Sequence, residues 1–123
     1  MNYKPILIVA GEPNSIFLEI FFKSLNKLKI KNPIILIASL KLVKLQMIEL
    51  KYKIKIKILD KNNITSHQLN NNCINLIDVE YNPNKAFEKI SMKSNVYIHN
   101  CFDVAFEIIK TTKIFKFING PIS

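Results

Sequence analysis

The sequence predicts a single α/β domain with three layers, in which helices cover both faces of a mainly parallel β-sheet. Short apolar runs of strand length alternate along the chain with stretches whose apolar residues recur at helical spacing. The 123 residues are enough for one small domain with its own core. A content of 49% hydrophobic and 22% charged residues is typical of a globular rather than a disordered chain.

The first predicted unit is a strand, a tight loop and a helix. Residues 6–10 form an unbroken apolar run, which is typical of a strand buried on both faces. A Gly-Glu-Pro turn ends the run at residues 11–13, and Asn14 or Ser15 is expected to cap the helix that follows. The apolar face of that helix is expected to consist of Phe17, Ile20, Phe21, Leu25 and Leu28.

The middle of the chain contains three further predicted strands. A second buried strand covers residues 34–38 and leads into a helix over residues 39–50. Lysine and isoleucine alternate over residues 53–58, which predicts a half-exposed strand whose lysines discourage edge-to-edge pairing. A polar, asparagine-rich loop over residues 60–73 then leads to a short strand over residues 74–79.

The last part of the chain is predicted to contain a loop, a helix and a strand. Residues 81–93 are expected to be loop with at most a turn of helix. Ser94 or Asn95 is expected to cap a helix that runs to Thr111, and a final strand covers residues 114–118. The apolar stripe of the helix is expected to be Ile98, Cys101, Phe102, Ala105, Ile108 and Ile109.

The chain is strongly basic, with a formal net charge of +9 at pH 7. All of its basic residues are lysines, and they are spread over helix ends and one strand rather than clustered with aromatic residues. We therefore expect a solvated lysine-rich surface and no nucleic-acid partner. The positive field also favours a negatively charged small-molecule substrate.

The sequence contains features that bear on its compartment. Cys73 and Cys101 lack the close spacing of a zinc or redox motif, and free thiols are typical of a reducing compartment. The apolar start is too short for a signal peptide, and no run approaches the ~18 apolar residues of a membrane-spanning helix. We expect a cytoplasmic protein with no membrane partner.

Two loops that follow predicted strands carry the chain's only glycines. Gly11 leads into a helix N-terminus, where free backbone N–H groups favour anions, and Gly120 follows the last strand. Ligands of parallel sheets bind at the carboxyl ends of the strands, so both loops are candidate substrate or phosphate contacts. Tight turns that need glycine anyway are the alternative. Glu12 is a candidate ligand for an amine or a metal, or a group that stabilises the turn.

The remaining polar residues form no recognisable catalytic set. His99 and Asp103 are four residues apart on a predicted helix and could touch, although a surface histidine is the more common case. His67 lies in a polar loop without a patterned partner. No complete catalytic set is expected within the 123 residues.

Residues 4–19 (KPILIVAGEPNSIFLE) and 117–123 (FINGPIS) resemble two segments of the 4-hydroxythreonine-4-phosphate dehydrogenase family. In that family a first strand runs into Gly-Glu/Asp-Pro-x-Gly-Ile-Gly-Pro-Glu, and a later strand runs into Gly/Ala-Pro-Ile/Val-x-Lys. The Gly-Glu-Pro core, Ile16 and Glu19 fit the first pattern. Ser15 and Phe17 stand where the family has glycines, and Leu18 stands where it has proline.

The resemblance implies an NAD-dependent oxidation of 4-phosphohydroxy-L-threonine, followed by decarboxylation, in pyridoxal 5′-phosphate (vitamin B6) biosynthesis. It implies a fold like that of isopropylmalate dehydrogenase, a homodimer, and a divalent metal ion that acts as a Lewis acid. Residues 1–123 would then be the N-terminal part of the enzyme, incomplete at the C-terminus, inactive alone, and lacking the second domain. The candidate cleft-loop residues carried over from the family are Gly11, Glu12, Pro13, Gly120 and Pro121.

Two alternatives stay open at this stage. The chain could be a small basic α/β module that binds an anionic ligand or nucleic acid without catalysis. It could also belong to a related enzyme that acts on another phosphate-containing substrate. The coding sequence beyond residue 123 discriminates between the first two hypotheses, because a stop codon there favours the module and a continuing frame favours the dehydrogenase.

Overall fold

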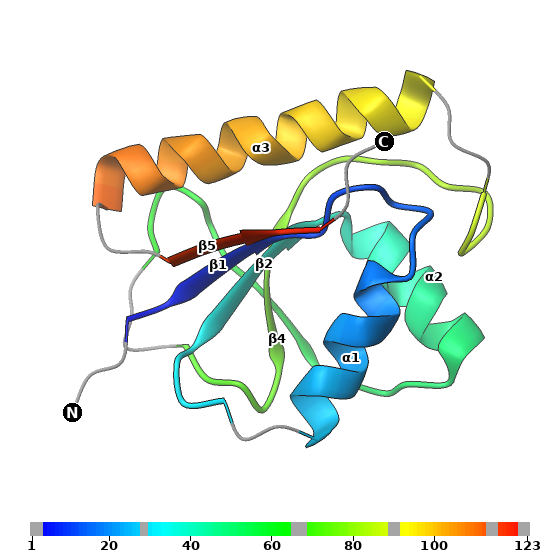
Figure 1. Cartoon of the computed structure of the whole chain (residues 1–123), viewed down its shortest axis with the longest axis horizontal. Helices are drawn as coiled ribbons and strands as arrows, with labels where there is room; N and C mark the ends of the chain where they lie inside the picture. Colours follow the sequence, from blue (N-terminus) through cyan, green and yellow to red (C-terminus); the bar gives the residue numbers. More distant parts are fainter. Residues whose placement is uncertain (1–3, 28–29, 65–68, 89–91, 113–115, 121–123) are drawn as a thin grey trace.

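The structure is a computed structural model that describes residues 4–27, 30–64, 69–88, 92–112 and 116–120 (Figure 1). Strands and helices alternate through most of the chain, as the sequence predicts. The elements are β1 (Ile6–Val9), α1 (Phe17–Lys27), β2 (Ile34–Ala38), α2 (Leu40–Leu50), β3 (Ile56–Ile58), β4 (Ile74–Asp78), α3 (Met92–Thr112) and β5 (Lys116–Asn119).

The five strands form one sheet in the order β3-β4-β2-β1-β5. Every neighbouring pair is parallel, so the prediction of a mainly parallel sheet is confirmed. Helices α1 and α2 contact each other on one face, while α3 packs across β1 and β2 on the opposite face (Figure 1). This arrangement is the predicted three-layer α/β/α fold.

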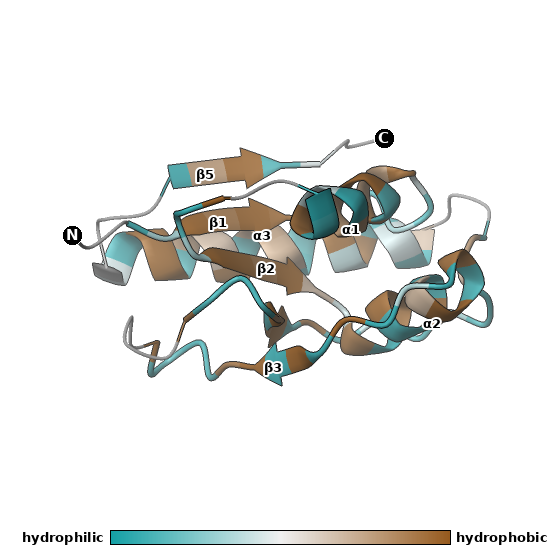
Figure 2. Cartoon of the chain, turned by 90° about the horizontal axis from the view of Figure 1, so that it is seen from below, coloured by the Kyte–Doolittle hydropathy of each residue, from teal (hydrophilic) through white to brown (hydrophobic). Residues whose placement is uncertain are grey.

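The core lies around the three central strands. β2 is buried along its whole length, and β1 and β4 are buried at all but one position each. Figure 2 shows β1 and β2 as apolar strands that lie over α3. β1 and β2 are apolar throughout, as expected of strands that helices cover from both sides, whereas β4 also carries the buried Asn75. No helix in the described ranges is long and apolar enough to cross a membrane.

The buried face of α1 differs from the predicted one. Leu18, Phe21 and Phe22 are buried, whereas Ile20 is 51% exposed. Leu28 lies outside the described residues. Apolar side chains occupy two overlapping helical stripes of this segment, and periodicity alone does not decide between them. The Ser15 hydroxyl accepts a hydrogen bond from the Phe17 backbone N–H at 3.2 Å, which confirms one of the two predicted caps.

Two other boundaries differ from the predictions. The alternating segment forms a strand only over its last three residues, because β3 lies at the sheet edge and pairs with β4 alone. Ile58 of this strand is 57% exposed. Helix α3 begins at Met92, so Ser94 is a fully buried residue inside the helix rather than its cap. Most of the predicted stripe of α3 is buried, and Tyr97 joins it.

Candidate functional site

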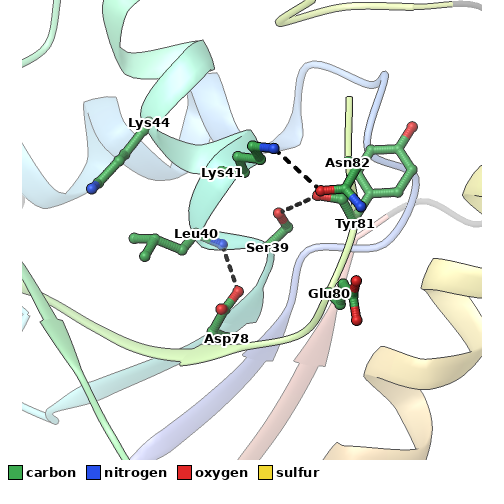
Figure 3. A pocket seen from close by; sticks show the side chains of 8 residues that line it. All are labelled: Ser39, Leu40, Lys41, Lys44, Asp78, Glu80, Tyr81 and Asn82. Carbon is green, nitrogen blue, oxygen red and sulfur yellow. Dashed lines mark hydrogen bonds between the residues drawn. The ribbon is translucent and has the colours of Figure 1, made fainter. Parts of the chain in front are cut away.

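The parallel strands place all their carboxyl ends at one edge of the sheet. Neighbouring strands β2 and β4 lead into helices on opposite faces, α2 and α3. A crevice is expected where the connections diverge in this way. The structure has a cavity of about 400 Å³ at this point (Figure 3). Its lining residues are Ser39, Leu40, Lys41, Lys44, Asp78, Glu80, Tyr81 and Asn82.

Ser39 lines this cavity and forms hydrogen bonds to three of the segments around it. It is the N-cap of α2, and its hydroxyl accepts a hydrogen bond from the Leu42 N–H at 3.1 Å. The same hydroxyl donates to the Tyr81 carbonyl at 3.1 Å. The Ser39 N–H donates to the hydroxyl oxygen of Tyr97 at 2.9 Å. A small polar residue directly after a buried strand thus joins α2, the segment after β4 and α3.

Asp78 ties the end of β4 to the same helix. Its Oδ1 atom accepts a hydrogen bond from the Leu40 N–H at 2.8 Å, at the first turn of α2. A carboxylate in this position also interacts favourably with the helix dipole. Lys41 reaches across from α2, and its Nζ donates to Asn82 Oδ1 at 3.3 Å. These two hydrogen bonds link the two walls of the cavity.

A second hollow of about 300 Å³ lies on the other side of Glu80, Tyr81 and Asn82. Lys93 of α3 lines this hollow, and its Nζ lies 5.3 Å from the centre of the Tyr81 ring. The same Nζ donates a hydrogen bond to the Asn82 carbonyl. Tyr81 stacks on Tyr97, with ring centroids 4.7 Å apart. The segment after β4 thus contacts both α2 and α3.

Burial keeps the groups behind this segment protonated. It raises the pKa of the Tyr97 hydroxyl well above its ordinary value of 10.0. It also raises the pKa of the Cys101 thiol to about 12. The pKa of Tyr81 is raised as well, mainly by burial. Tyr97 is therefore a neutral acceptor for Ser39, and Cys101 is a core residue rather than a nucleophile.

The loop after β1 contains three of the predicted site residues. Gly11 has φ 77°, a left-handed conformation that favours glycine. The Glu12 side chain is only 5% exposed, and its Oε1 accepts from the backbone and side-chain nitrogens of Asn14, each at 3.2 Å. Pro13 is buried. Glu12 thus stabilises the turn, which is one of the two roles weighed from the sequence.

Gly120 lies directly beside this loop, at the end of β5. Its N–H donates to the Val9 carbonyl at 2.7 Å. A Cβ atom at Gly120 would lie 2.1 Å from the Ala10 carbonyl oxygen and 2.9 Å from Cγ of Phe17. The structure therefore brings the two glycine loops together at the carboxyl edge. Gly11 is needed for its left-handed backbone conformation, and Gly120 is needed because a side chain would collide with the neighbouring loop. Pro121 lies outside the described residues.

Gln46 is a site residue that the sequence did not single out. It is fully buried, and its Nε2 donates to the Pro13 carbonyl at 2.8 Å and to the Ala86 carbonyl at 2.9 Å. The Glu88 N–H donates to Asn14 Oδ1 at 2.7 Å and makes a second bridge between the same loops. The sequence could have pointed to Gln46, because it is a glutamine at a core position of an otherwise apolar helix face.

The other candidates lie apart from this edge. His99 and Asp103 are both exposed on α3, and within the described residues neither a hydrogen bond nor an ion pair joins them. His67 lies outside the described ranges. Both cysteines are free. No group of three His, Cys, Asp or Glu side chains that could hold a metal ion occurs in the part of the chain that the structure describes.

The fold and the crevice define a doubly wound α/β unit of the kind that binds small ligands at the carboxyl ends of its strands. No family model and no curated protein sequence matches the chain. Among solved structures, it is similar to a 4-hydroxythreonine-4-phosphate dehydrogenase from Burkholderia phymatum, with a TM-score of 0.84 and 18% identity over 100% of this chain. The same enzyme from Klebsiella pneumoniae gives a TM-score of 0.81 and 16% identity over 98% of this chain.

The chain spans about 38% of the length of each of these structures. The likeness covers essentially all of its own residues, so the fold expected from the two loop motifs is confirmed. The likeness to these structures is one of fold, and it covers the sheet and the helices between the Gly-Glu-Pro and Gly-Pro loops.

Proposed function

We propose that this chain is the N-terminal part of an NAD-dependent dehydrogenase that oxidises and decarboxylates 4-phosphohydroxy-L-threonine in pyridoxal 5′-phosphate biosynthesis. The observation that carries the proposal is that the two motif loops, far apart in sequence, meet at the carboxyl edge of a sheet with this enzyme's fold. Loop motifs that fall together at the ligand-binding edge are more specific than either motif alone.

In this proposal the chain supplies one wall of the substrate cleft. Gly11, Glu12, Pro13, Gly120 and Pro121 form the cleft loops. The buried Glu12 and the half-buried Asn14 hold the first loop in shape, so the loop presents backbone groups rather than a carboxylate. The net charge of +9 attracts a phosphorylated substrate to the domain.

The cofactors of the whole enzyme are NAD and a divalent metal ion. The described residues do not fit a complete metal site, since they contain no group of three suitable ligands. We therefore assign the metal ligands and the catalytic groups to parts of the enzyme outside these residues. The whole enzyme is proposed to be a cytoplasmic homodimer, and residues 1–123 alone are proposed to be inactive.

The test is to express the full reading frame that contains residues 1–123 and to follow NADH formation with 4-phosphohydroxy-L-threonine, with and without a divalent metal ion. We expect metal-dependent NADH formation from the longer product and none from the 123-residue chain. A frame that stops after Ser123 and gives a soluble, monomeric, folded product would instead favour the alternative of a non-catalytic module that binds an anion. The charged cavity beside α2 is the observation that supports this alternative.

A further inference from the structure

The strand β5 ends in the only asparagine of the sequence that a glycine follows, at Asn119 and Gly120. In such a pair the backbone nitrogen of the glycine is placed to attack the side-chain carbonyl carbon of the asparagine. Glycine favours the attack, because it has no Cβ atom beside its nitrogen and leaves the backbone free to rotate. Asparagine is accordingly among the thermolabile residue types. The sequence therefore places a chemically labile peptide at the carboxyl end of β5.

The native fold holds both reacting groups of this peptide. Gly120 is buried and its N–H donates to the Val9 carbonyl at 2.7 Å, so the nitrogen keeps its proton and faces β1. The side-chain nitrogen of Asn119, which would be the leaving group, donates to the Gly120 carbonyl at 2.9 Å. Ring closure also needs the Asn119 backbone to rotate out of its extended strand conformation. The folded chain therefore disfavours the reaction, although Asn119 itself is exposed.

The position of β5 allows this strand to open without the rest of the sheet. Among the described strands it pairs with β1 alone, and three of its four residues are exposed. Its half-buried side chain, Phe117, packs against the rings of Phe102 and Phe106, with centroids 6.0 and 6.2 Å away. Segments with so few buried contacts open at a lower free energy than core strands such as β2. Opening of β5 breaks the hydrogen bond that holds the Gly120 nitrogen.

We propose that Asn119 is a site of spontaneous deamidation, which the native fold suppresses and which reacts when β5 leaves the sheet. The Gly120 nitrogen bonds to Cγ of Asn119, the bond from Cγ to Nδ2 breaks, and the Gly120 amide proton leaves with the nitrogen as ammonia. Water then opens the cyclic imide at either carbonyl group and gives aspartate or isoaspartate. The reaction needs no group of the proposed cleft, so it stands independently of the dehydrogenase proposal.

The isoaspartate product prevents β5 from returning to its native pairing. Isoaspartate adds a methylene group to the backbone directly before Gly120, and both products add a negative charge. The fold has no space to spare at this point, because even a Cβ atom on Gly120 would collide with the Ala10 carbonyl oxygen. Deamidation thus makes a transient opening of β5 permanent and separates the two glycine loops.

The first experiment incubates the 123-residue chain at mildly alkaline pH, folded or unfolded in urea. Digestion after lysine at mildly acidic pH then releases residues 117–123, and mass spectrometry quantifies the amide and acid forms of this peptide. In urea we expect Asn119 to react faster than any other asparagine, and in the folded chain at least about tenfold more slowly than in urea. Equal rates in the folded and unfolded chains, or no preference for Asn119 in urea, would overturn the proposal.

A variant that loosens β5 tests whether opening of this strand controls the rate. Phe117→Ala removes the ring that packs against α3, so deamidation in the folded chain should accelerate several-fold while the rate in urea stays unchanged. Phe117→Leu tests the same contact if the alanine variant does not fold. Phe87→Ala is the matched control, because it truncates a half-buried phenylalanine outside β5. Equal acceleration by Phe117→Ala and Phe87→Ala, or none in either Phe117 variant, would overturn the assignment of the reaction to release of β5.

Discussion

The side-chain amide of Gln46 donates a hydrogen bond to the carbonyl oxygen of Pro13 at 2.8 Å. The same nitrogen donates to the Ala86 carbonyl, so one fully buried residue of α2 fastens the loop after β1 to the segment after β4. Its Oε1 atom is buried and has no hydrogen-bond partner within the described residues. The orientation of the amide is fixed, because the flipped form would direct an oxygen at two carbonyls.

Replacing Gln46 with methionine should destabilise the fold by about 1–3 kcal/mol, because the buried Pro13 carbonyl and the half-buried Ala86 carbonyl lose their donor. The similar volume of methionine limits any cavity effect. Chemical denaturation measures the change, with Leu50→Met on the same helix as the control. A Gln46→Met protein within about 0.5 kcal/mol of the wild type would show that the bridge contributes little.

Replacing Gly120 with alanine should destabilise the chain by about 1–3 kcal/mol, because the new Cβ would collide with the Ala10 carbonyl. Gly11→Ala should cost about 1–2 kcal/mol through its left-handed backbone conformation alone. Thermal unfolding compares both with Lys116→Ala, an exposed position on β5. Unchanged stability of Gly120→Ala would contradict the close approach of the two loops.

Alkaline pH should destabilise the protein through Cys101. Burial raises the pKa of this thiol from 9.0 to about 12, so the unfolded chain loses the proton first. The contribution of this thiol to the free energy of unfolding is complete below pH 9.0 and is lost as the pH rises toward 12. The loss between about pH 8 and about pH 10 should be about 1.4 kcal/mol.

Urea unfolding at several alkaline pH values measures this slope. Cys101→Ala should start from a lower stability and show a flatter dependence on pH, because the shifted thiol is gone. Cys73→Ala is the matched control, because it removes the half-buried thiol and leaves the buried one in place. Identical slopes in all three proteins would rule out the thiol as the cause.

Replacing Ser39 with alanine should cost about 1–2 kcal/mol, because α2 loses its N-cap. The change also removes the hydroxyl that donates to the Tyr81 carbonyl. Hydrogen exchange should then be faster both in the first turn of α2 and in residues 79–82. Faster exchange in α2 alone would show that Ser39 does not hold the segment after β4.

Much of the fold could be predicted because the apolar pattern of a strand indicates whether one or both of its faces are buried. Residues 34–38 are predicted and observed as a strand with the same limits, since an unbroken apolar run fits only a position covered on both faces. The face of α1 could not be predicted in the same way. Leu18 and Ile20 are both apolar, and only packing against the sheet and α2 selects Leu18.

The place of the two glycine loops in the fold could be predicted from the sequence, whereas their role as a substrate site stays a prediction. The proximity of Gly11 and Gly120 follows from the rule that parallel strands end at one edge, and strand order then makes β1 and β5 neighbours. The charged cavity was not predicted, because it depends on β2 and β4 being adjacent although β3 lies between them in sequence. Asp78 and Lys44 belong to different units of the chain, and no local pattern links them.

The most direct test of the proposed cleft is hydrogen exchange of the full reading frame's product, with and without NAD and 4-phosphohydroxy-L-threonine together. We expect ligand-induced protection at the carboxyl edge, in residues 10–16 and in the end of β5 at residues 117–120. The amino edge, at residues 30–34 and 69–73, should be unchanged. Protection at the amino edge, or none in residues 10–16 and 117–120 while the product forms NADH, would contradict the assignment of these loops to the substrate cleft.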